Sequence, residues 1–255
     1  MKPKHNKIFP NDPFLCLVIG GSGKGKTHFV YDILTSKYFL DFNNLIIYTN
    51  KPRIKYYYFL KHGFDNNIKK ELLFNALRAY EIREDTGEYE LKDIEEIVKS
   101  IAEDNKDNIS KSIIKVRVAK NLNYDDIPKN DKTIVVFDDC INDGNQDLQR
   151  EIFISGRGDQ IGAIYITQSF TELDPIIKRN ASCCAMFDLD EYDLTNINRR
   201  FNTGMDNRTF RNHCKKIWED DQYKHIYINP ILKRGERVKT KIIIEPLDTD
   251  SEDEI

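Results

Sequence analysis

Short runs of consecutive apolar residues recur along the chain, and polar stretches separate them. A strand that reads as a continuous apolar run is typical of a parallel sheet that helices cover on both faces. None of the runs approaches the 18 residues that a membrane-spanning helix needs. Six runs have this character, at residues 14–19, 45–48, 113–118, 133–137, 163–166 and 183–187.

Helical spacing occupies stretches between these runs. One predicted helix follows Thr27, and another has one apolar face because its apolar residues recur at three- and four-residue intervals. Alternating strands and helices predict an α/β fold with a mainly parallel sheet. Residues 225–228 and 240–244 flank the turn at 233–236, which predicts a closing β-hairpin. The apolar positions of the second helix are Leu91, Ile94, Ile97, Val98 and Ile101.

A glycine-rich segment lies between the first apolar run and the first predicted helix. It fits the pattern G-x-x-x-x-G-K-[ST], the P-loop, in which backbone N–H groups point inward around a phosphate. The helix that follows adds the positive end of its dipole. The segment predicts a nucleotide site made by Gly20, Gly21, Ser22, Gly23, Lys24, Gly25, Lys26, Thr27 and the adjacent His28.

Three side chains of this loop have separate expected roles. Lys26 would bridge the β- and γ-phosphates of ATP, and the Thr27 hydroxyl would ligate Mg²⁺. For Lys24 two interpretations stay open, a second phosphate contact and a solvated side chain.

The apolar run at 133–137 ends in two carboxylates. Asp138 would lie near the magnesium and hold its water shell, and Asp139 would polarise an attacking water. An alternative for Asp139 is capping of the next helix. Many P-loop ATPases carry Glu at this second place, so the shorter Asp139 would lie farther from the γ-phosphate. Together with the loop, the pair predicts a P-loop NTPase.

Three polar residues later in the chain complete the candidate site. Gln168 follows the run at 163–166, and ligands of parallel sheets bind at the carboxyl ends of strands, so it would contact the γ-phosphate or the attacking water. The alternative is a turn residue satisfied by backbone groups. Arg157 lies among small residues and would be an arginine finger that reaches a neighbouring subunit's nucleotide, with a surface ion pair as the alternative. Arg179 is the competing finger.

The charge is unevenly distributed along the chain. The 255 residues include 39 Lys and Arg against 42 Asp and Glu, a net charge of −3, yet five acids lie in the last eight residues. Residues 81–107 hold eleven acids against four bases, and residues 196–241 hold twelve bases against five acids. We interpret residues 1–247 as one domain with a helical acidic insertion at 67–110 and a basic extension at 196–247, and 248–255 as an acidic disordered tail.

Length and composition exclude several classes of protein. A domain of this length buries roughly three quarters of its unfolded surface, so it needs no disulfide or metal to fold. The N-terminus has no apolar segment for secretion, and we expect an intracellular protein. The five cysteines include no CxxC pair, so we expect buried apolar side chains rather than zinc ligands.

The order of the motifs is similar to that of one family. After the P-loop come Asp138-Asp139 at a strand end, a Gly-Arg pair, a Thr-Gln pair and an Arg-Asn pair. This series resembles the FtsK-HerA superfamily of ring ATPases. Within it, the sequence resembles the genome-packaging ATPases of poxviruses, other large eukaryotic DNA viruses, virophages and related transposons. The resemblance covers about residues 12–200 and rests on Gly156-Arg157, Thr167-Gln168 and Arg179-Asn180.

The resemblance implies a RecA-like core in which the Thr-Gln strand lies between the P-loop strand and the Asp138 strand. It implies a homo-oligomeric ring of five or six subunits that hydrolyses ATP with Mg²⁺ and moves double-stranded DNA into a preformed capsid. The implied partners are DNA and a capsid or portal-like protein, and the implied location is the host cytoplasm or viral factory, with association with the virion as an alternative. Gly158 stands where the family often has His, and the acidic insertion has no counterpart that we can place.

A DNA translocase needs a basic surface that faces the pore. The basic segment at 196–241 is the candidate, with a solvated face of local ion pairs as the alternative. No helix-turn-helix or zinc-finger signature accompanies it, so we expect contacts with backbone phosphates rather than bases. The predicted contacts are Arg199, Arg200, Arg208 and Arg211.

Other functions share a P-loop. A nucleoside or nucleotide kinase would need several arginines in a lid and no ring, and a non-motor switch protein of a virion would bind ATP without turnover. A GTPase is disfavoured because residues 50–53 lack the Asp of a guanine-reading motif and precede Asp138.

Overall fold

The strands form one eight-stranded sheet in the order β3-β2-β4-β5-β1-β6-β7-β8. The computed structural model of the chain describes residues 5–10, 13–37, 39–85, 90–104, 114–141 and 146–240. Strands β1 to β6 are parallel, and β7 pairs antiparallel with both β6 and β8. The strands are β1 (Leu15–Ile19), β2 (Asn44–Thr49), β3 (Lys115–Ala119), β4 (Thr133–Asp138), β5 (Ile161–Thr167), β6 (Cys183–Met186), β7 (Ile226–Ile228) and β8 (Val238–Lys239).

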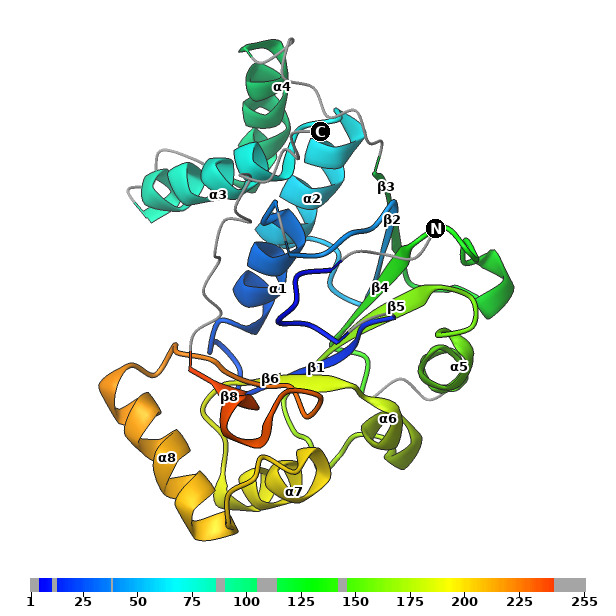
Figure 1. Ribbon diagram of the computed structural model, residues 1–255. Helices are drawn as coiled ribbons and strands as arrows, with labels where there is room; N and C mark the ends of the chain where they lie inside the picture. Colours follow the sequence, from blue (N-terminus) through cyan, green and yellow to red (C-terminus); the bar gives the residue numbers. More distant parts are fainter. Residues whose placement is uncertain are drawn as a thin grey trace, which may run out of the picture.

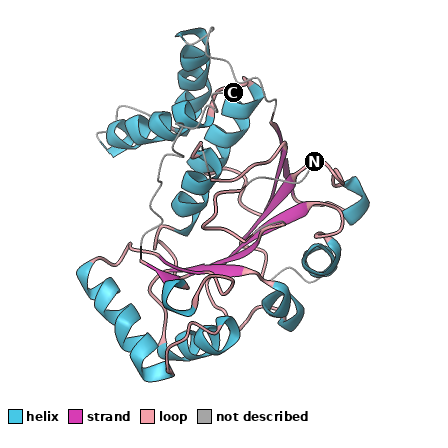
Figure 2. Ribbon diagram, viewed as in Figure 1, coloured by secondary structure: helices cyan, strands magenta, loops and turns pink. Residues whose placement is uncertain are grey.

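Helices cover both faces of the sheet, which confirms the predicted α/β fold (Figure 1). The first four helices pack on one face and the last four on the other; Figure 2 shows the sheet between them. The helices are α1 (Lys26–Thr35), α2 (Lys55–Asp65), α3 (Lys70–Asp85), α4 (Ile94–Asp104), α5 (Asp147–Ser155), α6 (Pro175–Asn180), α7 (Glu191–Phe201) and α8 (Asn207–Asp220). Single 3-10 turns lie at Leu91–Asp93, Tyr124–Asp126 and Arg234–Glu236.

Each central strand contributes to two hydrophobic cores because successive side chains of a strand point to opposite faces. In β1, Cys16 and Val18 pack beneath α1 to α4, whereas Leu15 and Leu17 pack beneath α5 to α8. All five residues of β1 are buried, as the continuous apolar run predicts. The five cysteines are also buried and free of disulfides, which confirms the expected apolar role.

Two sequence predictions need correction. The run at 113–118 was expected to be buried on both faces, but β3 lies at the edge of the sheet, where Lys115 and Arg117 are exposed. The closing hairpin is present, but its second strand is Val238–Lys239, earlier than predicted. Residues 241–244 of the predicted strand and the acidic tail at 248–255 lie outside the described residues.

The acidic insertion is helical where it is described. Its helices α3 and α4 pack with α2 at one end of the sheet (Figure 1). Val98 and Ile94 are buried and the polar residues of α4 face outward, as the predicted spacing requires. Within the described ranges, no helix combines the length and apolar character needed to cross a membrane.

Candidate nucleotide-binding site

The P-loop connects β1 to α1 at the carboxyl edge of the sheet. Gly25 has φ of 90°, a left-handed conformation that glycine adopts without steric cost, and it immediately precedes the first residue of α1. At Gly20 the backbone lies so close to Phe187 that an added Cβ would stand 2.7 Å from the phenylalanine Cβ. The motif therefore has the strand-loop-helix geometry that places backbone N–H groups around an anion.

Lys26 lies inside this loop. Its Nζ donates hydrogen bonds of 2.6 Å to the backbone oxygens of both Gly20 and Gly21. Burial lowers the pKa of Lys26, and the carboxylates of Asp138 and Asp139 oppose that shift by favouring the charged form. The ammonium group is thus held by the phosphate-binding loop, where the charges of the two carboxylates also act on it.

The two carboxylates end β4, two strands away from β1. Asp138 is 9% exposed, and its Oδ2 accepts a 2.5 Å hydrogen bond from the hydroxyl of Tyr57. Burial raises the pKa of Asp138; the Tyr57 bond opposes this shift and the adjacent carboxylate of Asp139 adds to it. A buried carboxylate oxygen beside a P-loop is a suitable ligand for Mg²⁺ or its water shell.

Asp139 has a different environment. Its φ of 58° is left-handed, and its carboxylate pairs with the ammonium of Lys51, which follows β2. The next helix, α5, begins at Asp147 and has Gln146 at its N-cap, so the capping interpretation of Asp139 is wrong. The carboxylate is about one third exposed and therefore accessible to water.

Strand β5 brings Gln168 to the same edge. β5 lies between β1 and β4, the order that the family resemblance implies, and Thr167 accepts a 3.2 Å backbone hydrogen bond from Gly20. Gln168 is exposed directly after this residue. Within the described part of the chain its side chain has no hydrogen-bond partner, so the backbone-satisfied turn interpretation has no support. The P-loop, Gln168 and Asp138 thus lie at the carboxyl ends of three adjacent strands.

Lys24 and His28 contact other protein groups. The Nζ of Lys24 lies 3.2 Å from Asp188 and 3.1 Å from the Gln222 side-chain oxygen, so it is neither simply solvated nor turned into the loop. His28 lies 3.3 Å from Asp32 and 3.7 Å from Glu81 of α3. Its imidazole therefore links the helix after the P-loop to the acidic insertion.

The contacts of His28 with Asp32 and Glu81 make part of the folding stability depend on pH. The ion pairs with Asp32 and Glu81 raise the pKa of His28 from 6.5 to about 9. Although burial opposes it, His28 and Lys55 lower the pKa of Glu81 to about 2. The contribution of protonated His28 is therefore complete below pH 6.5 and is lost as the pH rises through 9.

Replacing His28 with Gln is expected to lower the free energy of unfolding by ~1–2 kcal/mol at pH 6, because two partly buried ion pairs are lost. Urea unfolding at a series of pH values measures this difference, which should shrink as the pH rises through about 9. His213→Gln is the control, because the imidazole of His213 makes no hydrogen bond or ion pair with the described residues. A difference that persisted at high pH would contradict a protonated His28.

The arginine-finger candidates gather at the C-terminus of α6. Arg157 donates a 3.1 Å hydrogen bond to the Asn180 oxygen, and Arg179 is exposed in the last turn of the helix. Ser182, just beyond the helix, bonds to the Leu15 oxygen at the amino end of β1. Both arginines therefore lie near the amino-terminal ends of the strands, whereas the P-loop of the same chain lies at their carboxyl ends. The five residues of β1 separate the two ends by about 17 Å.

Several basic side chains predicted to contact DNA are bound within the protein. Arg200 donates to the oxygens of Lys178, Arg179 and Ala181, and so caps α6. Arg211 bonds to Glu191 at 3.0 Å. Arg208 is exposed at the start of α8. The local-ion-pair alternative therefore applies to Arg211, whereas backbone oxygens at the end of α6 hold the guanidinium of Arg200.

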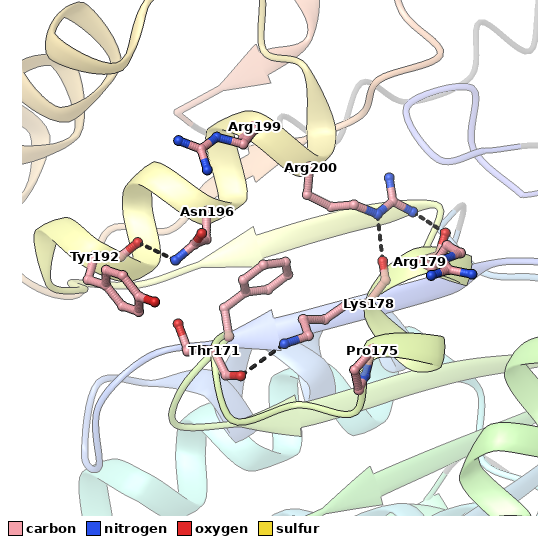
Figure 3. Close-up of a pocket in the computed structure, with 9 residues that line it drawn as sticks. Thr171, Pro175, Lys178, Arg179, Tyr192, Asn196, Arg199 and Arg200 are labelled. Atoms are coloured by element: carbon pink, nitrogen blue, oxygen red, sulfur yellow. Dashed lines mark hydrogen bonds between the residues drawn. The ribbon is translucent and has the colours of Figure 1, made fainter.

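A groove between α6 and α7 keeps cationic groups accessible. It has a volume of about 470 Å³, and Figure 3 shows Arg199 and Arg200 of α7 on one side and Lys178 and Arg179 of α6 on the other. No carboxylate is among its described lining residues. The guanidinium groups of Arg199 and Arg179 form no hydrogen bond or ion pair with the rest of the described chain. The groove is lined by Phe170, Thr171, Pro175, Lys178, Arg179, Tyr192, Asn196, Arg199 and Arg200.

Sequence reasoning missed three residues of this site. Tyr57 and Lys51 contact the carboxylates, and Phe187 packs against Gly20. None of them lies in a motif. Their signals, one tyrosine in a run of three and one lysine after an apolar run, do not distinguish them from ordinary core and surface residues.

The fold and the loop together define a P-loop NTPase. No protein-family model matches the chain, and no curated protein matches it. It is similar to the genome-packaging NTPase B204 of Sulfolobus turreted icosahedral virus 2 in complex with sulfate, at 16% identity and a TM-score of 0.50, with 93% of this chain and 100% of B204 covered. This likeness shows that the two proteins share their fold.

Two other solved structures are similar at lower TM-scores. B204 in complex with AMPPCP matches at 15% identity and a TM-score of 0.47, covering 91% of this chain and 98% of B204. VirB4 of Thermoanaerobacter pseudethanolicus matches at 13% identity and a TM-score of 0.45, covering 91% of this chain and 90% of that one. The similar structures include a viral packaging NTPase, the class that the motif series resembles.

Proposed function

We propose that this protein is an ATPase that packages double-stranded viral DNA as a homo-oligomeric ring. One observation carries the proposal: the P-loop, Gln168 and the Asp138-Asp139 pair meet at one sheet edge, in a fold shared over the full length of a genome-packaging NTPase. A capsid or portal-like protein is the docking partner that this activity requires.

The residues present fit ATP with Mg²⁺. The loop amides and the start of α1 would hold the phosphates, and Lys26 would move from the loop carbonyls to the β- and γ-phosphates. Thr27, in the first turn of α1, and Asp138 supply the oxygen ligands that magnesium prefers. Asp139, accessible to water, would accept the proton of the attacking water, and Gln168 would orient that water.

The position of the two candidate arginine fingers supports the proposed ring. Arg157 and Arg179 are exposed at the sheet edge opposite their own P-loop. Neither would reach a nucleotide in the P-loop of its own chain, whereas a neighbouring subunit in the proposed ring would bring its P-loop toward this end of the strands. We propose that one of the two acts as the finger in trans.

We assign the DNA contact to the groove between α6 and α7. Its accessible cations, with no carboxylate among the described lining residues, suit the phosphates of a DNA backbone, which attract proteins without regard to sequence. Arg199 is the best candidate for a direct contact because it lines the groove and has no partner among the described residues. Arg200 supports the groove by capping α6 rather than by binding DNA.

Replacing Arg199 with Glu is expected to weaken binding to a short DNA duplex ~10-fold, because one phosphate contact is lost and a repulsive charge is gained. The slope of log affinity against log salt should fall by about 1. Fluorescence anisotropy at several salt concentrations measures both. Lys120→Glu makes the same charge change next to β3, at the other end of the sheet, and should leave the affinity unchanged. Equal effects of the two variants would rule out the groove.

The decisive experiment measures ATP turnover with and without double-stranded DNA on protein whose oligomeric state is determined in the same sample. A packaging motor should form a ring and hydrolyse ATP faster with DNA. A monomer that ignores DNA and phosphorylates nucleosides or nucleotides would be a kinase, and a protein that binds ATP without turnover would be a switch.

A further inference from the structure

The connection from β2 into α2 contacts both carboxylates at the end of β4. Lys51 pairs with Asp139, and Tyr57 donates to Asp138. The two contacts differ in environment, because the Lys51 side chain is 72% exposed whereas Tyr57 is 1% exposed. A buried hydrogen bond holds a fixed geometry, whereas an exposed lysine is readily exchanged for water. Tyr57 is therefore the contact that can fix a carboxylate.

The geometry leaves one oxygen of Asp138 for a second ligand. The Tyr57 hydroxyl bonds to Oδ2 at 2.5 Å, and Oδ1 accepts no hydrogen bond from the described residues. A carboxylate held through one oxygen presents the other in a single direction, which is how outer-shell partners orient metal ligands.

The start of α2 is itself fixed to the acidic insertion. Lys55 lies 3.2 Å from Glu81 and 2.6 Å from Glu84, both on α3, and the Tyr56 hydroxyl lies 3.3 Å from Glu81. Glu81 also faces His28, directly after the P-loop. One carboxylate of the insertion thus braces the helix that carries Tyr57 and the helix that carries Thr27.

We propose that Tyr57 is a positioning residue that aims Asp138 at the magnesium ion of bound ATP, and that the acidic insertion keeps it in place. The proposal rests on the proposed ATPase function, because it assigns the metal role to Asp138. It assigns a structural role, the support of α2, to the acidic insertion, which has no counterpart in the family resemblance.

The test compares Tyr57→Phe with Tyr31→Phe. Tyr31 is equally buried, and its hydroxyl bonds to the Leu73 oxygen at 2.7 Å rather than to a carboxylate of the site. Isothermal titration calorimetry measures the affinity for AMPPCP with EDTA and with Mg²⁺. Tyr57→Phe should bind AMPPCP in EDTA as the wild type does. The increase in affinity on adding Mg²⁺ should be ~10-fold smaller than in the wild type, with a similar fall in kcat. Tyr31→Phe should behave as the wild type.

A double-mutant cycle with Asp138→Asn separates positioning from general stability. If Tyr57 acts through Asp138, the double variant should lose no more of the Mg²⁺ gain than Asp138→Asn alone. Additive losses, an unchanged Mg²⁺ gain in Tyr57→Phe, or a Tyr57→Phe protein that unfolds while Tyr31→Phe stays folded would overturn the proposal. A wild type whose AMPPCP affinity did not depend on Mg²⁺ would instead count against the proposed function.

Discussion

Alanine at position 26 is expected to reduce ATP turnover by ~10²–10³-fold, the usual cost of removing one group that stabilises a developing negative charge. Nucleotide binding should also weaken, because the half-buried ammonium that faces the P-loop carbonyls and both carboxylates is lost. Phosphate release measures turnover, and calorimetric titration with AMPPCP measures binding.

Lys24→Ala is a matched control in the same loop. Lys24 points to Asp188 and Gln222 rather than into the loop, so its loss should change turnover only a fewfold. Equal losses in Lys24→Ala and Lys26→Ala would mean that the Lys26 contacts do not identify the phosphate-binding lysine.

The central strands and the P-loop could be predicted because each is encoded locally. A strand buried on both faces reads as an apolar run wherever it lies in the sheet, and β1, β4 and β5 all fit this description. Strand β3 departs from it because an edge position, with Lys115 and Arg117 exposed, depends on which strands pair with it. The hairpin likewise starts its second strand at Val238, because its register depends on pairing with β7 rather than on its own apolar residues.

The contacts around the carboxylates could not be predicted because they join distant segments. Tyr57 meets Asp138 only after β2 and β4 pair and α2 packs on the sheet. Arg200 likewise shows that the role of a charged side chain cannot be predicted when it depends on contacts with a distant segment. Its position in a basic segment indicates a solvent-facing cation, but the open carbonyls at the end of α6 bind its guanidinium. Sequence thus identifies the groups that carry chemistry more readily than those that hold them in place.

Asn at position 139 is expected to lower kcat by ~10²–10⁴-fold, the usual contribution of a general base, while nucleotide binding stays close to that of the wild type. The substitution is well suited to the site because Asp139 has φ of 58°, and Asn adopts this left-handed conformation as readily as Asp. Alanine would add backbone strain and confuse the result. Single-turnover ATP hydrolysis and AMPPCP titration measure the two effects separately.

Lys51→Gln tests whether the loss comes from the carboxylate or from its ion pair. Both Asp139→Asn and Lys51→Gln remove the pairing with Lys51, but only the first removes the proton acceptor. We therefore expect Lys51→Gln to keep turnover within a fewfold of the wild type. A loss in Lys51→Gln as large as that in Asp139→Asn would assign Asp139 to holding the β2–α2 connection rather than to activating water.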